Sequence, residues 1–156
     1  MNKDNKWVIF DLDGTLANID KRRLISTKID TGKINWDIFF NPDNIKLDQP
    51  NHPVIHMART LKAAGHNIAI FSCRSKASKQ VSLDWLAQHD VPFDVIKMRP
   101  TGKDFHFMKD DLLKQHWLDT LVDKDDVFAV FDDRQQVVDM WRQNGLTCFQ
   151  VADGDF

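Results

Sequence analysis

Two pairs of acidic residues stand directly after short apolar runs in this sequence. Asp11 and Asp13 follow the first such run, and Asp132 and Asp133 follow the fourth. Four carboxylates gathered in one place would repel one another unless a cation lay among them. A site of oxygen ligands with room for water suits Mg²⁺. The pattern therefore predicts a magnesium site, provided that the fold brings the two pairs together.

The elements that must position these residues alternate between short apolar runs and helical periodicity, as in βαβ units around a parallel sheet. We expect strands over residues 7–10, 67–71, 91–98, 127–131 and 146–151. Helices are expected from 51 to 65, about 76 to 89, about 110 to 122, and between 134 and 145. In such a sheet ligands bind beyond the carboxyl ends of the strands, which is where both acidic pairs fall. Ser72 and Arg74 follow the second strand in the same way.

The length and composition fit one globular domain over residues 1–156. Hydrophobic residues make up 42% and charged residues 28%, and the net charge of -2 neither predicts nor excludes a polyanionic substrate. Residues 17–50 lack clean periodicity and are expected to form a small insertion over one end of the sheet. This stretch mixes basic residues with Trp36, Phe39 and Phe40, which could stack a base, although anchoring the insertion is the favoured interpretation.

The sequence gives no indication of an exported or membrane protein. Its first residues are polar and resemble no signal peptide, and no apolar stretch is long enough to cross a membrane. Cys73 and Cys148 both lie in apolar runs, which favours reduced, buried thiols over a disulfide. A cytoplasmic enzyme is the expectation.

The motifs resemble those of the haloacid dehalogenase (HAD) superfamily of phosphatases. Residues 10–16, FDLDGTL, are similar to its nucleophile motif, and Ser72 resembles the second motif, a Ser or Thr closing a strand. A Lys on a later helix is the third motif and Asp132-Asp133 the fourth. The resemblance implies a three-layer α/β/α doubly wound parallel sheet with a small cap after the first strand.

A closer resemblance is to the phosphatase half of the phage polynucleotide kinase 3'-phosphatases. It is carried by residues 109–114, KDDLLK, and by 132–156, which begin DDRQQVVDMWR and end QVADGDF. On this resemblance Lys114 takes the third-motif position, with Lys109 as the second choice, and Arg22 and Arg74 fall at substrate-binding positions. No Gly-x-x-x-x-Gly-Lys-Ser/Thr loop is present, so no kinase half is expected in this chain.

The resemblance assigns a role to each candidate residue. Asp11 is the expected nucleophile, Asp13 the acid/base partner, Ser72 a hydrogen-bond donor to the phosphoryl group and Lys114 a compensating charge. The expected Mg²⁺ ligands are Asp11, Asp13, Asp132 and Asp133. The expected substrate-binding residues are Thr15, Arg22, Arg74 and Lys109.

The expected reaction is hydrolysis of a phosphomonoester through an aspartyl-phosphate, on the 3'-phosphate end of a nucleic acid or on a nucleotide. A 5'-nucleotidase for free mononucleotides stays open. So does a phosphoacceptor signalling domain, although that class lacks an acid/base residue at the position of Asp13. An inactive binding module is the third alternative, weakened by the presence of every expected catalytic group.

Overall fold

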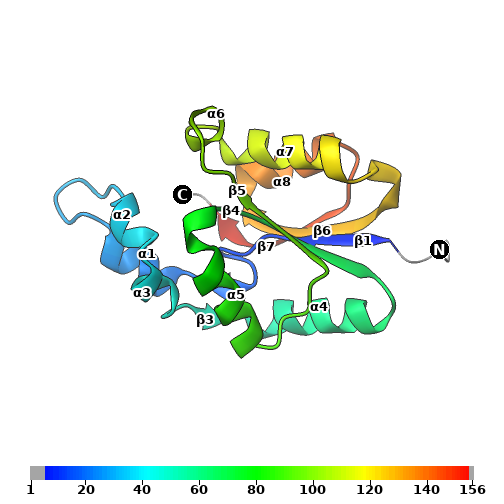
Figure 1. Cartoon of the computed structure of the whole chain (residues 1–156), viewed down its shortest axis with the longest axis horizontal. Coiled ribbons are helices and arrows are strands. Elements are labelled where there is room, and N and C mark those ends of the chain that lie inside the picture. Colours follow the sequence, from blue (N-terminus) through cyan, green and yellow to red (C-terminus); the bar gives the residue numbers. More distant parts are fainter. Residues whose placement is uncertain (1–5, 155–156) are drawn as a thin grey trace.

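A parallel five-stranded sheet forms the centre of the protein in the computed structural model, which describes residues 6–154 (Figure 1). The strand order is β5-β4-β1-β6-β7, and each neighbouring pair is parallel. Their bounds are Trp7–Phe10 for β1, Asn67–Ser75 for β4, Val95–Arg99 for β5, Val127–Arg134 for β6 and Cys148–Gly154 for β7. The expected doubly wound α/β/α fold is confirmed.

Helices cover both faces of this sheet. On one face lie α4 (His52–Ala63) and α5 (Lys79–Gln88), the latter preceded by the 3₁₀ turn η1 (Lys76–Ser78). On the other lie α7 (Asp110–Leu121) and α8 (Gln135–Gln143) (Figure 1). Among the described residues no helix is long and apolar enough to cross a membrane.

The alternation of side chains along each strand explains this double cover. In β1, Val8 and Phe10 pack in the core on the side of α4 and α5, while Ile9 packs in the core on the side of α7 and α8. Ile70 and Phe71 of β4 divide in the same way. Because successive residues of a strand point to opposite faces, a strand covered on both sides is apolar at every position.

Residues 17–50 form a separate group of short elements beyond one end of the sheet (Figure 1). Strands β2 (Ala17–Asn18) and β3 (Gln49–Pro50) pair antiparallel at its base. Between them lie the helices α1 (Asp20–Ser26), α2 (Trp36–Phe39) and α3 (Pro42–Ile45). The side chains of Asn35 and Asn41 cap α2 and α3, accepting backbone N–H bonds at 3.1 Å and 2.9 Å.

Strands β4 and β6 run further than their apolar residues predict, and β7 also ends later than predicted, at Gly154 instead of Val151. β4 continues to Ser75 instead of ending at Phe71, and β6 continues to Arg134 instead of Phe131. The register of each breaks near its end, between Ser72 and Ser75 in β4 and between Asp132 and Arg134 in β6. Polar residues at these ends are buried, which hydropathy could not indicate.

The remaining elements connect the sheet to α7 and β6. A short helix α6 (Lys103–His106) follows β5, and the 3₁₀ turn η2 (Lys124–Asp126) precedes β6. Both cysteines are free: Cys148 is buried and Cys73 is half-buried. The expected burial therefore holds for Cys148 and only in part for Cys73.

Candidate active site

The loop after β1 turns back on itself and presents two carboxylates. The amide of Asp11 donates to the carbonyl of Phe131 in β6 at 2.9 Å, which ties the end of β1 to the neighbouring strand. The amide of Ala17 donates to the carbonyl of Leu12 at 3.0 Å and closes the turn, and the Leu12 side chain is fully buried. The loop is thereby held at both ends, which fixes where Asp11 and the intervening Asp13 lie.

Asn51 fastens the same loop to helix α4. It occupies the N-cap position of α4, as predicted, but its side chain makes no capping bond. Its Nδ2 instead donates to the carbonyl of Thr15 at 3.0 Å, and its amide donates to the carbonyl of Leu16 at 2.9 Å. The start of α4 therefore supports the loop of Asp11 and Asp13.

Gly14 allows the loop to approach β6 closely. Its φ of +81° lies in the left-handed region, and a Cβ placed there would lie 2.1 Å from Oδ2 of Asp133. A side chain at this position would therefore meet both backbone strain and a direct clash. The glycine is what allows the carboxylate of Asp133 to lie beside the loop.

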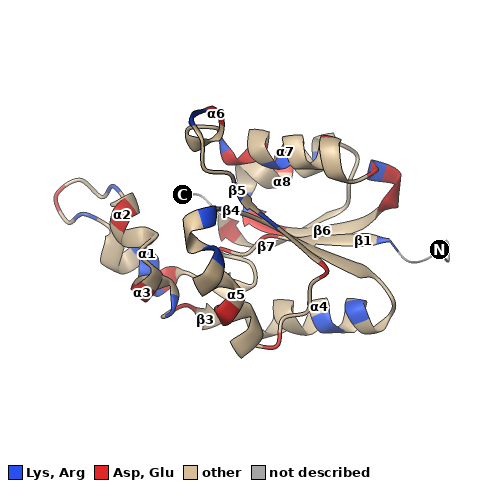
Figure 2. Ribbon diagram, viewed as in Figure 1, with Lys and Arg blue, Asp and Glu red and all other residues tan. Residues whose placement is uncertain are grey.

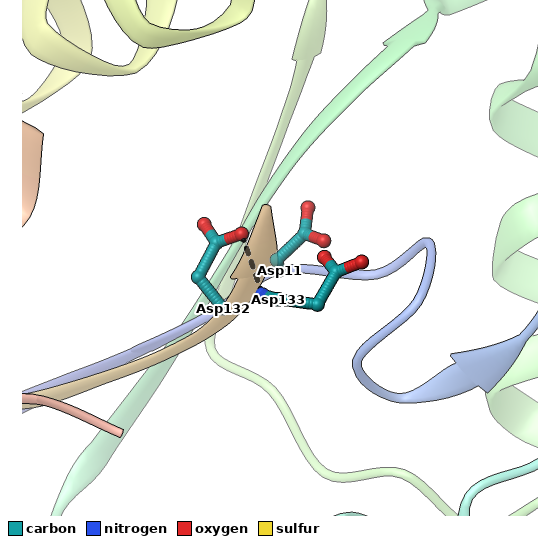
Figure 3. Close-up of side chains that lie close together, drawn as sticks. All are labelled: Asp11, Asp132 and Asp133. Carbon is teal, nitrogen blue, oxygen red and sulfur yellow. Dashed lines mark hydrogen bonds between the residues drawn. The ribbon is translucent and has the colours of Figure 1, made fainter. Parts of the chain in front are cut away.

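Three of the four predicted acidic residues come together (Figure 3). One carboxylate oxygen each from Asp11, Asp132 and Asp133 lies within 4.8 Å of the other two, and all three residues are buried. The amide of Asp133 also donates to Oδ1 of Asp132 at 2.9 Å, the dashed line in Figure 3. This buried acidic triad consists of oxygen ligands that a divalent cation could hold.

Lys114 neutralises part of the triad. Its Nζ reaches from α7 and donates to Oδ1 of Asp11 and Oδ2 of Asp132, both at 2.8 Å. The indole of Trp141 in α8 donates to the same Oδ2 of Asp132 at 3.1 Å. Three carboxylates and one ammonium leave two negative charges, which is the charge that one Mg²⁺ would offset.

The pKa values of the triad reflect this crowding in a buried place. Burial raises the pKa of Asp11 well above its ordinary value, with the charge of Lys114 opposing and those of Asp132 and Asp133 adding to the rise. Burial and the charge of Asp132 raise the pKa of Asp133 to about 6. Burial opposes the charged form of Lys114, but the charge of Asp11 prevails and raises the Lys114 pKa.

The side chain of Asp13 lies apart from the triad, among arginines. It accepts from Nε of Arg74 at 3.0 and 3.1 Å and from Nη2 of both Arg74 and Arg22. Burial alone would raise the pKa of Asp13, but the charges of Arg74 and Arg22 outweigh it and hold the pKa well below its ordinary value. The two carboxylates of the Asp-Leu-Asp motif therefore have opposite pKa shifts.

Asp48 is a site residue that sequence reasoning missed. It is buried at the end of the insertion and accepts from Arg22 at 3.0 and 2.7 Å and from Arg74 at 3.2 Å. Burial raises the pKa of Asp48 although Arg22 opposes the rise. Asp48 lies in no motif, and a single Asp in an irregular stretch gives no signal in one sequence.

Of the other predicted residues Thr15, Ser72 and Lys109, only Thr15 has a hydrogen bond to the triad among the bonds of the described residues. Thr15 is buried and its hydroxyl donates to Asp11 at 3.3 Å and to Asp133 at 3.5 Å. Ser72 is buried, and its hydroxyl accepts the Arg74 amide at 3.3 Å. Lys109 is exposed just before α7, so the geometry favours Lys114 as the charged partner of Asp11.

A second ion-pair network fixes the start of α7, the helix that carries Lys114. Asp110 accepts from Arg99 of β5 at 2.8 Å and from Arg134 of β6 at 2.6 Å. Arg99 also donates to the carbonyl of Cys73 at 3.2 Å. These bonds join α7 to the ends of three strands and thereby hold Lys114 over the triad.

The comparison with known families agrees with this geometry. A model of the polynucleotide kinase PNKP phosphatase domain matches residues 5–156. The chain belongs to this family. It is a HAD-type phosphatase domain related to that of PNKP.

Solved structures support the assignment to the PNKP phosphatase family. A chain of a Pnkp1/Rnl/Hen1 complex is 30% identical with a TM-score of 0.76, and the match covers 98% of this chain and 48% of that one. A chain of the Pnkp1/Rnl/Hen1 RNA repair complex is also 30% identical, with a TM-score of 0.79, covering 100% and 45%. The present chain thus spans about half the length of these relatives.

More distant structures show the fold alone. A predicted phosphatase from Clostridium acetobutylicum is 16% identical with a TM-score of 0.69, and the match covers 94% of this chain and 84% of that one. The fold of this chain is therefore shared with a protein that has diverged widely from it in sequence.

Proposed function

We propose that this PNKP-type phosphatase domain is a magnesium-dependent phosphomonoesterase that acts on the 3'-phosphate ends of nucleic acids. The observation that carries the proposal is that Asp11 and Asp13 have different surroundings. Asp11 lies in the acidic triad against Lys114, while Asp13 keeps a separate environment among arginines. A carboxylate among acidic groups that could share a cation and a carboxylate among guanidinium groups are suited to different roles.

Asp11 is the proposed nucleophile. Its carboxylate attacks phosphorus while the ester P–O bond breaks, which forms an aspartyl-phosphate. Asp11, the carbonyl of Asp13 and Asp132 would hold Mg²⁺, with Asp133 beside them. The ion would offset the repulsion between an anionic nucleophile and an anionic phosphate. Lys114 supplies a positive charge at the same carboxylate, and Ser72 would donate to a phosphoryl oxygen.

Asp13 is the proposed proton carrier. It first donates a proton to the leaving alkoxide, and it then takes a proton from the water that hydrolyses the aspartyl-phosphate. In the structure described here Arg22 and Arg74 stabilise its ionised form, which suits the second step. The first step requires a protonated Asp13, so the arginines must bind something else before it.

The substrate phosphate is the proposed replacement partner for the arginines. The side chains of Arg22 and Arg74 expose 0% of their surface, whereas that of Asp13 exposes 19%. A phosphate that reaches the guanidinium groups must therefore displace the carboxylate of Asp13. Losing two positive neighbours raises the pKa of that carboxylate and prepares it to carry the proton. Guanidinium groups bind phosphate well because their paired donors match its oxygens.

The substrate class rests on the PNKP family and on its relatives. One similar chain comes from an RNA repair complex, which supports RNA ends as well as DNA ends as substrates here. Free 5'-mononucleotides are the second candidate class, since the same chemistry would serve a 5'-nucleotidase. In both cases the reacting group is a phosphate monoester.

The proposal is tested with a panel of substrates in the presence of Mg²⁺. We expect release of phosphate from 3'-phosphorylated DNA or RNA oligonucleotides, faster than from 5'-mononucleotides at equal concentration. Asp11→Asn should abolish release, whereas the exposed control Asp43→Asn should not. Activity retained by Asp11→Asn would disprove the nucleophile. A stable phosphoprotein without turnover would favour a phosphoacceptor domain instead.

A further inference from the structure

The insertion carries one tryptophan whose ring is largely uncovered. Trp36 exposes 55% of its surface, whereas the tryptophans of α5, α7 and α8 are buried. Its ring stacks on Phe40, with centroids 5.9 Å apart and planes at 21°. It also meets the ring of Phe39 edge-on at 5.4 Å. Two neighbouring rings thus fix the indole, and the rest of it faces solvent.

Anchoring does not account for Trp36. Phe39 is the residue that anchors α2, since it is 2% exposed and meets Arg22 inside the insertion. The sequence could not separate these aromatics from one another, and the structure does. An exposed indole that is held rigid by its neighbours costs little conformational entropy when it binds a flat partner.

Trp36 is connected to the proposed active site through two contacts. Its ring touches Phe39, and the guanidinium carbon of Arg22 lies 4.4 Å from the centroid of the Phe39 ring. The same guanidinium donates to Asp13 and to Asp48. The exposed indole is therefore one ring away from an arginine that pairs with the proposed proton carrier.

The charges around Trp36 do not make a uniformly basic surface. Figure 2 shows basic (blue) and acidic (red) residues mixed over the insertion. The basic residues of the first part of the insertion are Lys21, Arg22, Arg23, Lys28 and Lys33, and the acidic ones are Asp20, Asp30 and Asp37. Charge alone is therefore a weak source of affinity for a nucleic acid strand here. Stacking on an aromatic ring is a source that does not depend on net charge.

We propose that Trp36 is a stacking platform for a nucleobase near the phosphate-bearing end of the substrate. This inference rests on the proposed function and makes it more specific. It assigns to the insertion the recognition of a base, beside the site where the phosphate reacts with Asp11. Because every base has a flat face, such a platform favours nucleic acid over other phosphate monoesters without selecting a sequence.

Kinetics of Trp36→Ala provide the first test. We expect KM for a 3'-phosphorylated oligonucleotide to rise roughly tenfold with kcat unchanged, because base stacking acts on binding. Trp36→Phe should restore most of the affinity. Hydrolysis of glycerol phosphate, which has no base, should be unchanged in both variants. Phe128→Ala is the matched control, since Phe128 is 53% exposed at the opposite end of the sheet, near the start of β6.

Tryptophan fluorescence gives a second readout that needs no turnover. In Asp11→Asn, binding of a 3'-phosphorylated oligonucleotide should quench the emission, and Trp36→Phe in that background should remove the quenching. An equal loss of activity on glycerol phosphate in Trp36→Ala, or oligonucleotide kinetics unchanged by it, would overturn the stacking platform. If the wild-type enzyme released no phosphate from any 3'-phosphorylated oligonucleotide but quenching by such a strand depended on Trp36, the proposed reaction would fail and the platform would stand.

Discussion

The guanidinium of Arg22 donates to both carboxylate oxygens of Asp48, from Nε at 3.0 Å and from Nη2 at 2.7 Å. The two residues stand near opposite ends of the insertion, 26 positions apart. Since Arg22 also binds Asp13, this pair links the insertion to the loop after β1. The insertion is thereby part of the site as well as a cover over it.

We predict that Asp48→Ala weakens both folding and activity. Arg22 and Arg74 would lose a buried partner, and removing one member of a buried ion pair costs about 3 kcal/mol or more of the free energy of unfolding. Phosphatase activity should also fall, because Asp48 is the partner that would still hold Arg22 and Arg74 in place once phosphate displaces Asp13. Urea unfolding and phosphate release measure the two effects.

The control for Asp48 is an exposed pair in the same insertion. Asp43 lies 3.7 Å from Lys46, and both side chains are largely exposed. Asp43→Ala should change neither unfolding nor activity, since exposed ion pairs contribute little. If Asp48→Ala behaved like Asp43→Ala, the buried pair would have no role in holding the arginines.

We predict that Gly14→Ala lowers stability and activity by more than backbone strain alone would cause. Gly14 and Gly145 have nearly the same φ, +81° and +80°, but only Gly14 faces Asp133, since nothing lies within 4 Å of a Cβ at Gly145. Gly145→Ala should lower the free energy of unfolding by about 1 to 2 kcal/mol and leave activity intact. Gly14→Ala should lower it further and abolish phosphate release. Equal effects in both variants would mean that the clash with Asp133 is relieved without cost.

The stability of the metal-free protein should depend on pH through Asp133. Its folded pKa of about 6 is above the ordinary 3.8, so the folded state binds the proton more tightly than the unfolded state does. The contribution of protonated Asp133 to the free energy of unfolding is fully present below about pH 4, and it is lost as the pH rises through about 6. The raised pKa of Asp11 acts in the same direction. Thermal unfolding without metal should show this decline.

The stabilisation caused by Mg²⁺ should have the opposite pH dependence and increase as the pH rises. The ion needs ionised carboxylates, so the increase in Tm that it causes should be larger at about pH 7.5 than at about pH 5. A ligand that binds only the folded state at about 100 times its Kd stabilises by about 2.7 kcal/mol. Asp133→Asn, which cannot ionise, should reduce the pH dependence in both experiments. A Tm that did not respond to Mg²⁺ at any pH would contradict a magnesium site in the triad.

Much of the sheet could be predicted because its strands are buried on both faces. Residues 7–10 and 127–131 are apolar at every position, which is typical of central parallel strands. The first range forms β1, and the second forms most of β6. The apolar pattern predicts the ends of β4 and β6 too early, because buried polar residues such as Ser72 and Asp132 look like loop residues in a sequence. Hydropathy reports side-chain chemistry and not the hydrogen bonds of the backbone.

The sequence by itself determined which residues stand at the carboxyl ends of the strands, and hence that Asp11, Asp132 and Asp133 could meet. Only the tertiary structure decided that the side chain of Asp13 turns away from them toward Arg22 and Arg74, and that Asp48 joins these arginines. The physical reason is that strand ends follow from local patterns, whereas these ion pairs join residues far apart in the sequence. Arg22 and Asp48 meet because the insertion folds back on itself, and Asp13 and Arg74, 61 positions apart, meet because β1 and β4 are neighbours in the sheet.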